Sequence, residues 1–411
     1  MLKFEQTKLD NGLQIVAESS DTARSVAFGF FVRTGARDEV GPELGLSHYL
    51  EHMMFKGSER RSALDVNREF DEMGANYNAF TSHENTVYYG NVLPEFLPRV
   101  VDLLADMMRP SLRQDDFDME KNVILEEMAM YEDIPQHDLA DKALRLHFGA
   151  HGLGHPVIGT KQSIGDMTSQ QMADYFRRRY AAGNVVAVAT GKVDFAEFTD
   201  LLAERCGQWE KLSADRELTD AGASLGGQTI QKATLTRQHL ALLSPGPSAQ
   251  DETRFAAAIL ANAIGDTTGS RYFWSLVDPA LADVASCGYE PMDGAGIFLS
   301  YICCDPAQAK KVLEVARAEL AKVVSEGITA EELTRSANKT ASALTLGSEV
   351  PMGRFVSLGM NWLYRKEYRS VAKDLEAILA VSLQEVNDLA RELAIDKTTT
   401  VALGPLENVV Q

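Results

Sequence analysis

Hydrophobic and polar residues follow two different rhythms along the chain. Near the N-terminus, "LQIVAES" and "SVAFGFFVRTG" are rich in β-branched and aromatic residues, which predicts strands. Later segments such as "PEFLPRVVDLLADMM" place apolar residues three and four apart, which predicts amphipathic helices. Strands follow strands before helices begin, without a strict alternation. This order predicts an α+β fold in which helices pack on one side of a largely antiparallel sheet.

The pattern occurs twice in the chain. "TSQQMADYFRRRYAAGNVVAVATGKV" begins at Thr168 and aligns without gaps with "VSLQEVNDLARELAIDKTTTVALGPL", which begins at Val381. Each copy predicts a helix opened by a Ser cap, then a turn, then a strand that ends in Gly. We therefore expect two homologous tandem domains. The first domain is predicted at residues 1–210 and the second at residues 229–411. The polar, Gly-rich stretch 211–228 between them is the predicted linker.

Composition narrows the functional classes. The 411 residues are 45% hydrophobic and 24% charged, which is typical of soluble globular proteins. No apolar run approaches the roughly 20 residues of a membrane helix, and the N-terminus does not resemble a secretion signal. The net charge of −19 argues against a nucleic-acid partner. Four cysteines without a CxxC pair predict free thiols of a reducing compartment, so we expect a cytoplasmic protein. The lack of a long apolar run predicts that it has no membrane partner.

The stretch "GLSHYLEHMMFKGS", residues 45–58, is the first candidate for chemistry. Its apolar residues recur at helical spacing, so His48, Glu51 and His52 should share one face of a helix. Two imidazoles one turn apart can bind one zinc ion, and the carboxylate can accept a proton from water. The order H-x-x-E-H is the inverzincin motif. The alternative is a surface helix that happens to carry His and Glu.

A catalytic zinc ion normally has three protein ligands and one open position. The third ligand could come from "DDFDMEKNVILEEMAMYED", where an apolar stripe predicts another helix. Glu120 and Glu127 are two turns apart on one face of that helix. A carboxylate here could complete the site, although an acidic solvated face would give the same pattern.

Taken together, these motifs resemble the pitrilysin/insulinase family of zinc peptidases. The chain resembles the short two-domain members of this family, which are similar to the subunits of the mitochondrial processing peptidase. The resemblance rests on H-x-x-E-H followed about 75 residues later by the second helix, and on "LDNGLQIV", "GANYNAFTSHENTVYY" and "GLGHPVIGT". It implies a Zn²⁺ cofactor. It also implies that the zinc ligands are His48, His52 and Glu127. Glu51 would then be the general base, and Glu120 would be an acid that orients one of the ligands.

The stretch "NYNAFTSHENTVYY" is expected to form a strand. In the family, an Asn-Ala strand edge pairs with the substrate backbone, which implies substrate binding by Asn78 and Ala79. The alternative is a core strand whose Asn lies in a turn. His83 in the same stretch is expected to have a structural role, because three better ligands are available.

The second copy of the fold lacks the metal motif. Its aligned positions are Ala256, Ile259 and Leu260, so the second domain should not bind metal. Family members often supply an Arg and a Tyr from this domain to the zinc site. The alignment places Val277 and Val284 there, and neither side chain can donate a hydrogen bond.

The nearby Arg271 and Tyr272 have the wrong spacing for this role. We therefore expect a dimer, in which a homologous partner subunit could supply the Arg/Tyr pair. A homodimer that uses other donors is the alternative.

These observations predict a zinc-dependent endopeptidase that hydrolyses peptides or unfolded segments in an enclosed chamber. The chain would then be the metal-carrying subunit of a dimer. The main alternative is a catalytically silent scaffold or assembly subunit of the same fold. A metal-binding regulator without turnover is a further alternative.

Overall fold

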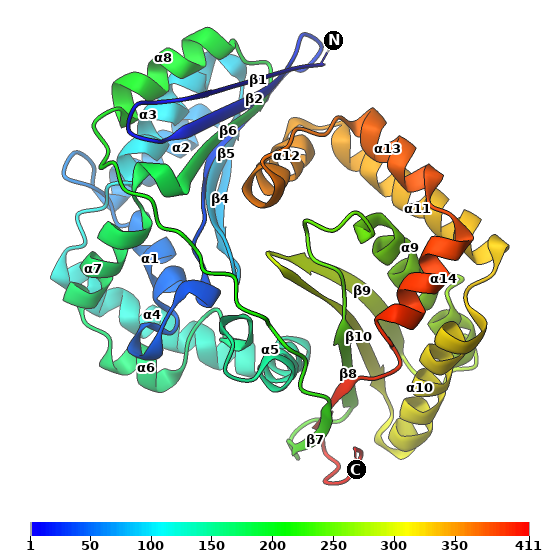
Figure 1. The fold of residues 1–411 in the computed structure, drawn as a ribbon. Coiled ribbons are helices and arrows are strands. Elements are labelled where there is room, and N and C mark those ends of the chain that lie inside the picture. The colour runs from blue at the N-terminus through cyan, green and yellow to red at the C-terminus, as the bar shows by residue number, and fades with distance from the viewer. Residues whose placement is uncertain (1, 411) are drawn as a thin grey trace. The chain divides into compact units, whose positions relative to one another are not determined.

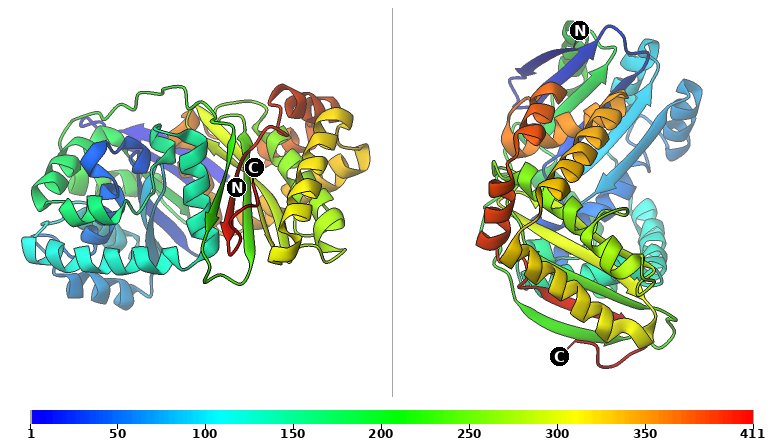
Figure 2. Two further views of the ribbon diagram at one scale, coloured as in Figure 1. Left: turned by 90° about the horizontal axis from the view of Figure 1, so that it is seen from below. Right: turned by 90° about the vertical axis from the view of Figure 1, so that its right-hand side faces the viewer.

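The computed structural model describes residues 2–410, which form two β-sheets with helices on both faces of each (Figures 1 and 2). Packing divides the chain into two compact units. Unit 1 consists of Met1–Met128, His155–Glu217 and Gly347–Arg369. Unit 2 consists of Ala129–Gly154, Leu218–Leu346 and Ser370–Gln411. The predicted α+β class with two similar layered halves is confirmed, whereas the predicted boundaries around residues 211–228 stay a prediction.

Unit 1 is built on a six-stranded sheet. The strands are β1 (Leu2–Lys8), β2 (Gln14–Ser20), β3 (Val26–Val32), β4 (Asn76–Thr81), β5 (Thr86–Val92) and β6 (Val185–Gly191). Their spatial order is β1-β2-β6-β3-β5-β4, and every neighbouring pair is antiparallel except β2 with β6. Strand β4 therefore lies at an edge of the sheet, and this edge carries the residues discussed below.

One face of this sheet is covered by helices from the first half of the sequence. They are α1 (Leu46–Met54), α2 (Ala63–Met73), α3 (Leu97–Met107), α4 (Gln114–Glu132), α6 (Lys161–Asp166), α7 (Ser169–Arg179) and α8 (Phe195–Cys206). The core beneath them alternates along the strands, with Phe28 and Phe30 of β3 pointing into it. Figure 1 shows α3 and α8 side by side.

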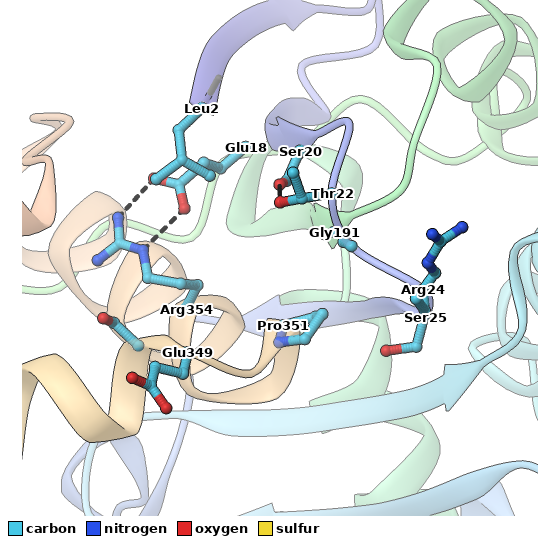
Figure 3. A pocket seen from close by; sticks show the side chains of 12 residues that line it. Leu2, Glu18, Ser20, Thr22, Arg24, Ser25, Gly191, Glu349, Pro351 and Arg354 are labelled. Carbon is cyan, nitrogen blue, oxygen red and sulfur yellow. Dashed lines mark hydrogen bonds and ion pairs between the residues drawn. The ribbon is translucent and has the colours of Figure 1, made fainter.

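The opposite face of the same sheet is covered by α12 (Pro351–Arg365), which comes from the second half of the sequence. Phe355 of α12 packs against Phe31, which points to the face of β3 opposite Phe28 and Phe30. Arg354 donates two hydrogen bonds, at 2.8 and 2.6 Å, to the buried carboxylate of Glu18 (Figure 3). A polar cavity of about 360 Å³ lies beside this pair, and none of its lining residues comes from α1. The sequence predicted helices on one side of the sheet, and the structure adds a helix, α12, on the other side.

Unit 2 repeats this plan on a five-stranded sheet. Its strands are β7 (Gly226–Gln231), β8 (Gln238–Pro245), β9 (Val284–Met292), β10 (Ala295–Cys304) and β11 (Thr399–Gly404), in the order β7-β11-β8-β10-β9. The helices on one face are α9 (Arg254–Gly265), α10 (Ala309–Glu326), α11 (Ala330–Ser348), α13 (Val371–Ala380) and α14 (Leu383–Glu392). Figure 2 shows these layers from two further directions.

The second face of the unit 2 sheet is covered by α5 (Pro135–Phe148), which comes from the first half of the sequence. Leu139 and Ala143 of α5 pack against Leu243 and Val401 of the strands. The two halves of the sequence therefore each contribute one helix to the unit built on the other half's sheet. Because α5 and α12 bury apolar faces against the opposite half's sheet, neither sheet is covered by its own half alone.

Local structure agrees with the repeated pattern in most details. In the second copy Ser382 caps α14, as predicted, but in the first copy Thr168 rather than Ser169 caps α7. The reason is the spacing Thr-x-x-Gln, because the Thr168 side chain accepts a hydrogen bond from the N–H of Gln171. The four cysteines are free, as predicted. Among residues 2–410, no helix has the length and apolar content needed to cross a bilayer.

Candidate metal centre

The start of helix α1 is fixed by tight backbone packing. Gly45 adopts a φ of +89°, and a Cβ at this position would lie 2.6 Å from the carbonyl oxygen of Ile158. The carboxylate of Glu39 accepts hydrogen bonds from the N–H groups of Gly45 and Ser47, each at 2.7 Å. Burial raises the pKa of Glu39 to about 7, although the two backbone donors oppose this shift. These contacts set where the helix begins and hence which way its side chains point.

Helix α1 has one buried side and one polar side. Because apolar residues at helical spacing are buried, His48, Glu51 and His52 are left together on the other, partly exposed side. The predicted shared face is therefore present. The buried side consists of Leu46, Ser47, Tyr49, Leu50, Met53 and Met54.

His48, His52 and Glu127 bring three possible ligand atoms together. The Oε2 atom of Glu127 lies 3.4 Å from Nε2 of His52 and 3.8 Å from Nε2 of His48. All three lie within 4.8 Å of one another, and within residues 2–410 they form the one such group of three or more His, Cys, Asp or Glu side chains. Tetrahedral zinc with ligands at about 2.0–2.1 Å separates its donor atoms by roughly 3.3 Å, so the spacing fits this ion.

The burial of these donors also fits a cation. Glu127 Oε2 is buried, and it has no hydrogen-bond partner among the described residues. Such an oxygen is costly to bury unless something positive replaces the lost water. The same holds for Nδ1 of His48, which lacks the outer partner that metal-bound histidines usually have.

Glu120 contacts one of the three ligand side chains, His52, but is not itself part of the ligand group. Its Oε1 atom is 2.8 Å from Nδ1 of His52, the ring nitrogen that points away from Glu127. Its other oxygen forms an ion pair with the ammonium of Lys56. Burial raises the pKa of Glu120, but the bonds to His52 and Lys56 outweigh burial and hold the pKa below its usual value. Lys56 was not predicted from the sequence, although it follows His52 by one helical turn.

Glu51 projects beside the ligand group without joining it. Its Oε2 atom accepts a hydrogen bond of 2.5 Å from the hydroxyl of Thr81, at the end of edge strand β4. Burial raises the pKa of Glu51, and the Thr81 bond partly offsets that shift. Thr81 is the second functional candidate that the sequence reasoning missed, since only the pairing of β4 beside α1 brings the two together.

The two histidines differ in charge behaviour. Burial lowers the pKa of His48 to about 3, helped by neighbouring His52. Burial also disfavours the His52 cation, but the Glu120 hydrogen bond and nearby carboxylates outweigh it and raise the pKa of His52. Because metals bind neutral imidazole, protonation competes with metal binding more readily at His52 than at His48.

Asn78 and Ala79 lie on edge strand β4, as the predicted substrate strand requires. Asn78 is exposed, whereas Ala79 is buried beneath the sheet. The Asn78 side-chain oxygen accepts a hydrogen bond of 2.9 Å from the N–H of Ala79. A peptide that paired with this edge would have to compete with that bond. His83, in the turn after β4, is outside the metal group, and burial lowers its pKa to about 4.

The corresponding helix of unit 2 has no chemistry of this kind. Ala256, Ile259 and Leu260 of α9 are all buried in an apolar core. Val277 ends the short helical turn Phe273–Val277, and Val284 begins edge strand β9.

The two residues at the wrong spacing are fully engaged within unit 2. Arg271 makes hydrogen bonds of 2.8 and 2.9 Å to Glu332 and another to the carbonyl of Gly327. Tyr272 is buried, with its hydroxyl 3.2 Å from Ser300. Both side chains are therefore engaged by residues of their own unit.

Comparisons with known proteins agree with this geometry. Residues 14–161 match the family described as Insulinase (Peptidase family M16), and residues 166–340 match the Peptidase M16 inactive domain. An uncharacterized zinc protease of Streptomyces coelicolor is 32% identical, over 98% of this chain and 90% of its own length. The uncharacterized zinc protease YmxG of Bacillus subtilis is 31% identical, over 97% of this chain and 98% of its own.

Solved structures share the fold at lower identity. A protease from Helicobacter pylori is 22% identical and superposes with a TM-score of 0.91, covering 98% of this chain and all of its own. A structure titled as a peptidase M16 inactive domain, from Pseudomonas fluorescens, is 17% identical with a TM-score of 0.90 over the full length of both chains.

The names of the relatives agree with the predicted zinc cofactor, and so does the donor group of His48, His52 and Glu127. The match to an inactive domain agrees with the apolar surroundings of α9. Two family matches cover most of the chain, and relatives above 30% identity span almost all of it. The chain therefore belongs to the insulinase, or M16, family of peptidases.

Proposed function

We propose that this chain is a zinc-dependent endopeptidase that hydrolyses peptides or unfolded segments. The observation that carries the proposal is the group of His48, His52 and Glu127, with Glu51 beside it on the same helix face. The relatives named zinc proteases support the same activity. A silent scaffold of this fold would have no need to keep four partly buried polar side chains together.

The residues divide the chemistry among them. His48, His52 and Glu127 would hold zinc, which when bound supplies a Lewis acid that polarises a carbonyl and acidifies water. Glu51 takes a proton from the attacking water and passes it to the leaving amine. Glu120 fixes the orientation of the His52 ring through Nδ1, and Lys56 fixes Glu120 in turn.

The proposed substrate lies along edge strand β4. The outer edge of β4 has no strand partner among the described residues, so an extended peptide could add to the sheet there. Backbone pairing at Asn78 and Ala79 tolerates many sequences, which suits an enzyme for unfolded segments. Thr81, at the end of the same strand, contacts Glu51, so a peptide on this edge would run toward the general base.

We further propose that the chain acts as the metal-carrying subunit of a dimer that encloses a chamber. The support is the missing pair of donors in unit 2, where Val277 and Val284 occupy the aligned positions and Arg271 and Tyr272 are engaged elsewhere. A homologous partner would supply the Arg and Tyr.

The central test is the variant Glu51→Gln, assayed with an unstructured peptide and analysed for metal. We expect zinc content to stay at the wild-type level while the cleavage rate falls by about 10²- to 10⁴-fold. Glu126→Gln, an exposed change on α4, is the matched control and should cleave like wild type. A Glu51→Gln protein that holds zinc and cleaves normally would sink the proposed mechanism.

The assembly is tested by assaying the purified chain alone and together with a co-encoded homologue. The heterodimer proposal expects activity to rise sharply only with the homologue present. Full activity of the chain alone would leave a homodimer as the working form.

A further inference from the structure

The hydroxyl of Thr81 makes a direct contact with the side chain of Glu51. Thr81 Oγ1 donates to Glu51 Oε2 over 2.5 Å. A threonine hydroxyl has one proton to donate, and here it is used on the carboxylate. No hydrogen bond to the other carboxylate oxygen, Oε1, occurs among the described residues. The contact therefore distinguishes the two oxygens of Glu51 and leaves Oε1 available to a water molecule.

The strand places this hydroxyl on the correct face. Alternate residues of β4 point to opposite sides of the sheet. Tyr77 and Ala79 pack into the core beneath α1 and α2, whereas Phe80 packs into the core beneath α12. Thr81 shares the side of Tyr77 and Ala79, so it faces α1. A shift of the strand by one residue would turn the hydroxyl away from Glu51.

The end of β4 is held firmly by the turn that follows. Ser82 N–H donates to the carbonyl of Asn85, which closes the turn toward β5. The N–H groups of Ala36 and Arg37 donate to the carbonyls of Ser82 and His83. Three backbone groups within two residues of Thr81 are thus paired: the N–H and carbonyl of Ser82 and the carbonyl of His83.

Buried charges secure the same turn. Glu84, which is 2% exposed, accepts a hydrogen bond from Arg37 at 2.7 Å and another from the hydroxyl of Tyr364 at 2.8 Å. Arg216 donates to the carbonyl of Glu84 and forms an ion pair with Asp38, both at 2.6 Å. Because charged hydrogen bonds in a dry environment are strong and directional, this turn has little freedom to move.

We propose that Thr81 is a positioning residue for Glu51: its hydroxyl anchors one carboxylate oxygen and aims the other at the attacking water. This inference rests on the proposed peptidase function. Glu51 is partly exposed on its helix, and without an anchor its three rotatable bonds would allow several orientations. The firm turn after β4 transmits the rigidity of the sheet to the carboxylate. An incoming peptide strand on β4 would pass directly beside this contact.

An ordinary structural threonine would have different consequences. If the hydroxyl only stabilised the strand, its loss would lower stability and leave the turnover number of the folded enzyme unchanged. A positioning role instead lowers kcat while KM and zinc affinity stay the same, because neither substrate binding nor the ligand group is altered.

The experiment compares Thr81→Val, which keeps the shape and removes the hydroxyl, with Thr81→Ser, which keeps the hydroxyl. We expect Thr81→Val to lower kcat by about 10- to 100-fold with KM within about 2-fold. Thr81→Ser should restore kcat to within a few-fold of wild type. Thr86→Val is the matched control, because Thr86 pairs with Thr81 across the hairpin and its hydroxyl bonds the Thr34 carbonyl instead.

A second measurement needs no activity. Thr81→Val should lower Tm in the wild-type background and have a smaller effect in a Glu51→Ala background, because the hydrogen bond exists only in the first. Zinc affinity, measured by chelator competition, should be unchanged in Thr81→Val. Equal Tm shifts in both backgrounds, or a Thr81→Val enzyme with wild-type kcat, overturns the inference. If wild type cleaves nothing, either alone or with its co-encoded homologue, while the Tm cycle shows coupling, the proposed function is overturned instead, and with it the catalytic role of the contact.

Discussion

Helix α1 of unit 1 and helix α9 of unit 2 occupy equivalent places in two copies of one fold, and their contents are opposite. Each contacts the edge strand of its own sheet, β4 or β9. In α1, His48 and His52 face Glu127 or Glu120 of α4, and Glu51 contacts Thr81. In α9 the aligned side chains are Ala256, Ile259 and Leu260, all in the apolar core. The fold itself therefore does not require the polar residues of α1.

This difference shows where the cost of function lies. Burying half of a His or Glu side chain costs free energy because the polar group loses hydration, whereas an apolar side chain has no such cost. In unit 1 that loss is offset by a set of specific partners: Glu120 for His52, Lys56 for Glu120 and Thr81 for Glu51. Unit 2 needs none of these partners, because its helix is packed like any other core element.

The strongest way to break the comparison is to make α1 resemble α9. The triple variant His48→Ala, Glu51→Ile, His52→Leu places the unit 2 residues on α1. We expect zinc content to fall from one per chain to none and peptide cleavage to disappear, since two of three ligands and the base are lost. Elemental analysis and a cleavage assay measure both. Circular dichroism should show a folded protein, and bound zinc at wild-type stoichiometry would refute the assigned ligands.

The second test concerns Glu39, the buried carboxylate that accepts hydrogen bonds at the start of α1; at the start of α9, the carboxylate of Asp251 that accepts from the N–H of Thr253 is exposed. Burial raises the pKa of Glu39 from 4.5 to about 7, so between these values the folded chain binds more protons than the unfolded chain. Its contribution to the unfolding free energy should therefore fall as pH rises from about 4.5 to 7, by about 3 kcal/mol in all, and stay level above.

Urea unfolding of wild type and Glu39→Gln at several pH values measures this contribution as the difference between the two profiles. The pH-dependent difference should span that window and flatten outside it. Parallel profiles for the two proteins across pH 4.5 to 7 would show that Glu39 does not titrate there.

A third, smaller effect is expected from the support of His52. Glu120→Gln keeps the size of the side chain but removes the charge that orients the His52 ring. We expect zinc affinity to fall by about 10- to 100-fold in chelator competition. Lys56→Met, which acts one contact farther away, should weaken zinc binding less than Glu120→Gln. The reverse order would mean that Lys56, rather than Glu120, governs the ring.

The smallest effect on activity is expected in unit 2. Arg271→Met removes the pair with Glu332, which should lower the unfolding free energy by about 1–2 kcal/mol. Because Arg271 is engaged within its own unit, kcat and KM should each change by less than about 2-fold. A large loss of kcat in the folded variant would show that Arg271 acts at the zinc site, contrary to its position in the alignment.

Much of the site could be predicted from sequence because its spacing is local. His48, Glu51 and His52 lie within five residues, and a helix fixes their relative directions. Glu127 and Glu120 share a second helix, so one contact between helices suffices to bring them in. Thr81 has no such signal, since its contact with Glu51 depends on the register of β4 beside α1. Lys56 could have been found as one turn beyond His52.

The fold was predicted in class but not in the covering of its sheets. Every residue of β3 is buried, and so is every residue of β6, which shows that both faces of the central strands are covered. The uninterrupted apolar runs "VAFGFFV" and "VVAVA" contain that signal. They cannot say which segment does the covering, because α12 lies more than 150 residues farther along the chain.

The exchange of α5 and α12 has a consequence for the order in which the protein can be made. The sheet of unit 1 is complete in sequence at Gly191, yet its second face stays open until residues 351–365 have been synthesised. During that interval Phe31 and Val188 are exposed on a nascent chain that has finished every strand of the sheet. The sheet of the N-terminal half is therefore covered only after some 160 further residues have been synthesised. Until then, the ribosome-bound chain exposes an apolar surface to which a chaperone could bind.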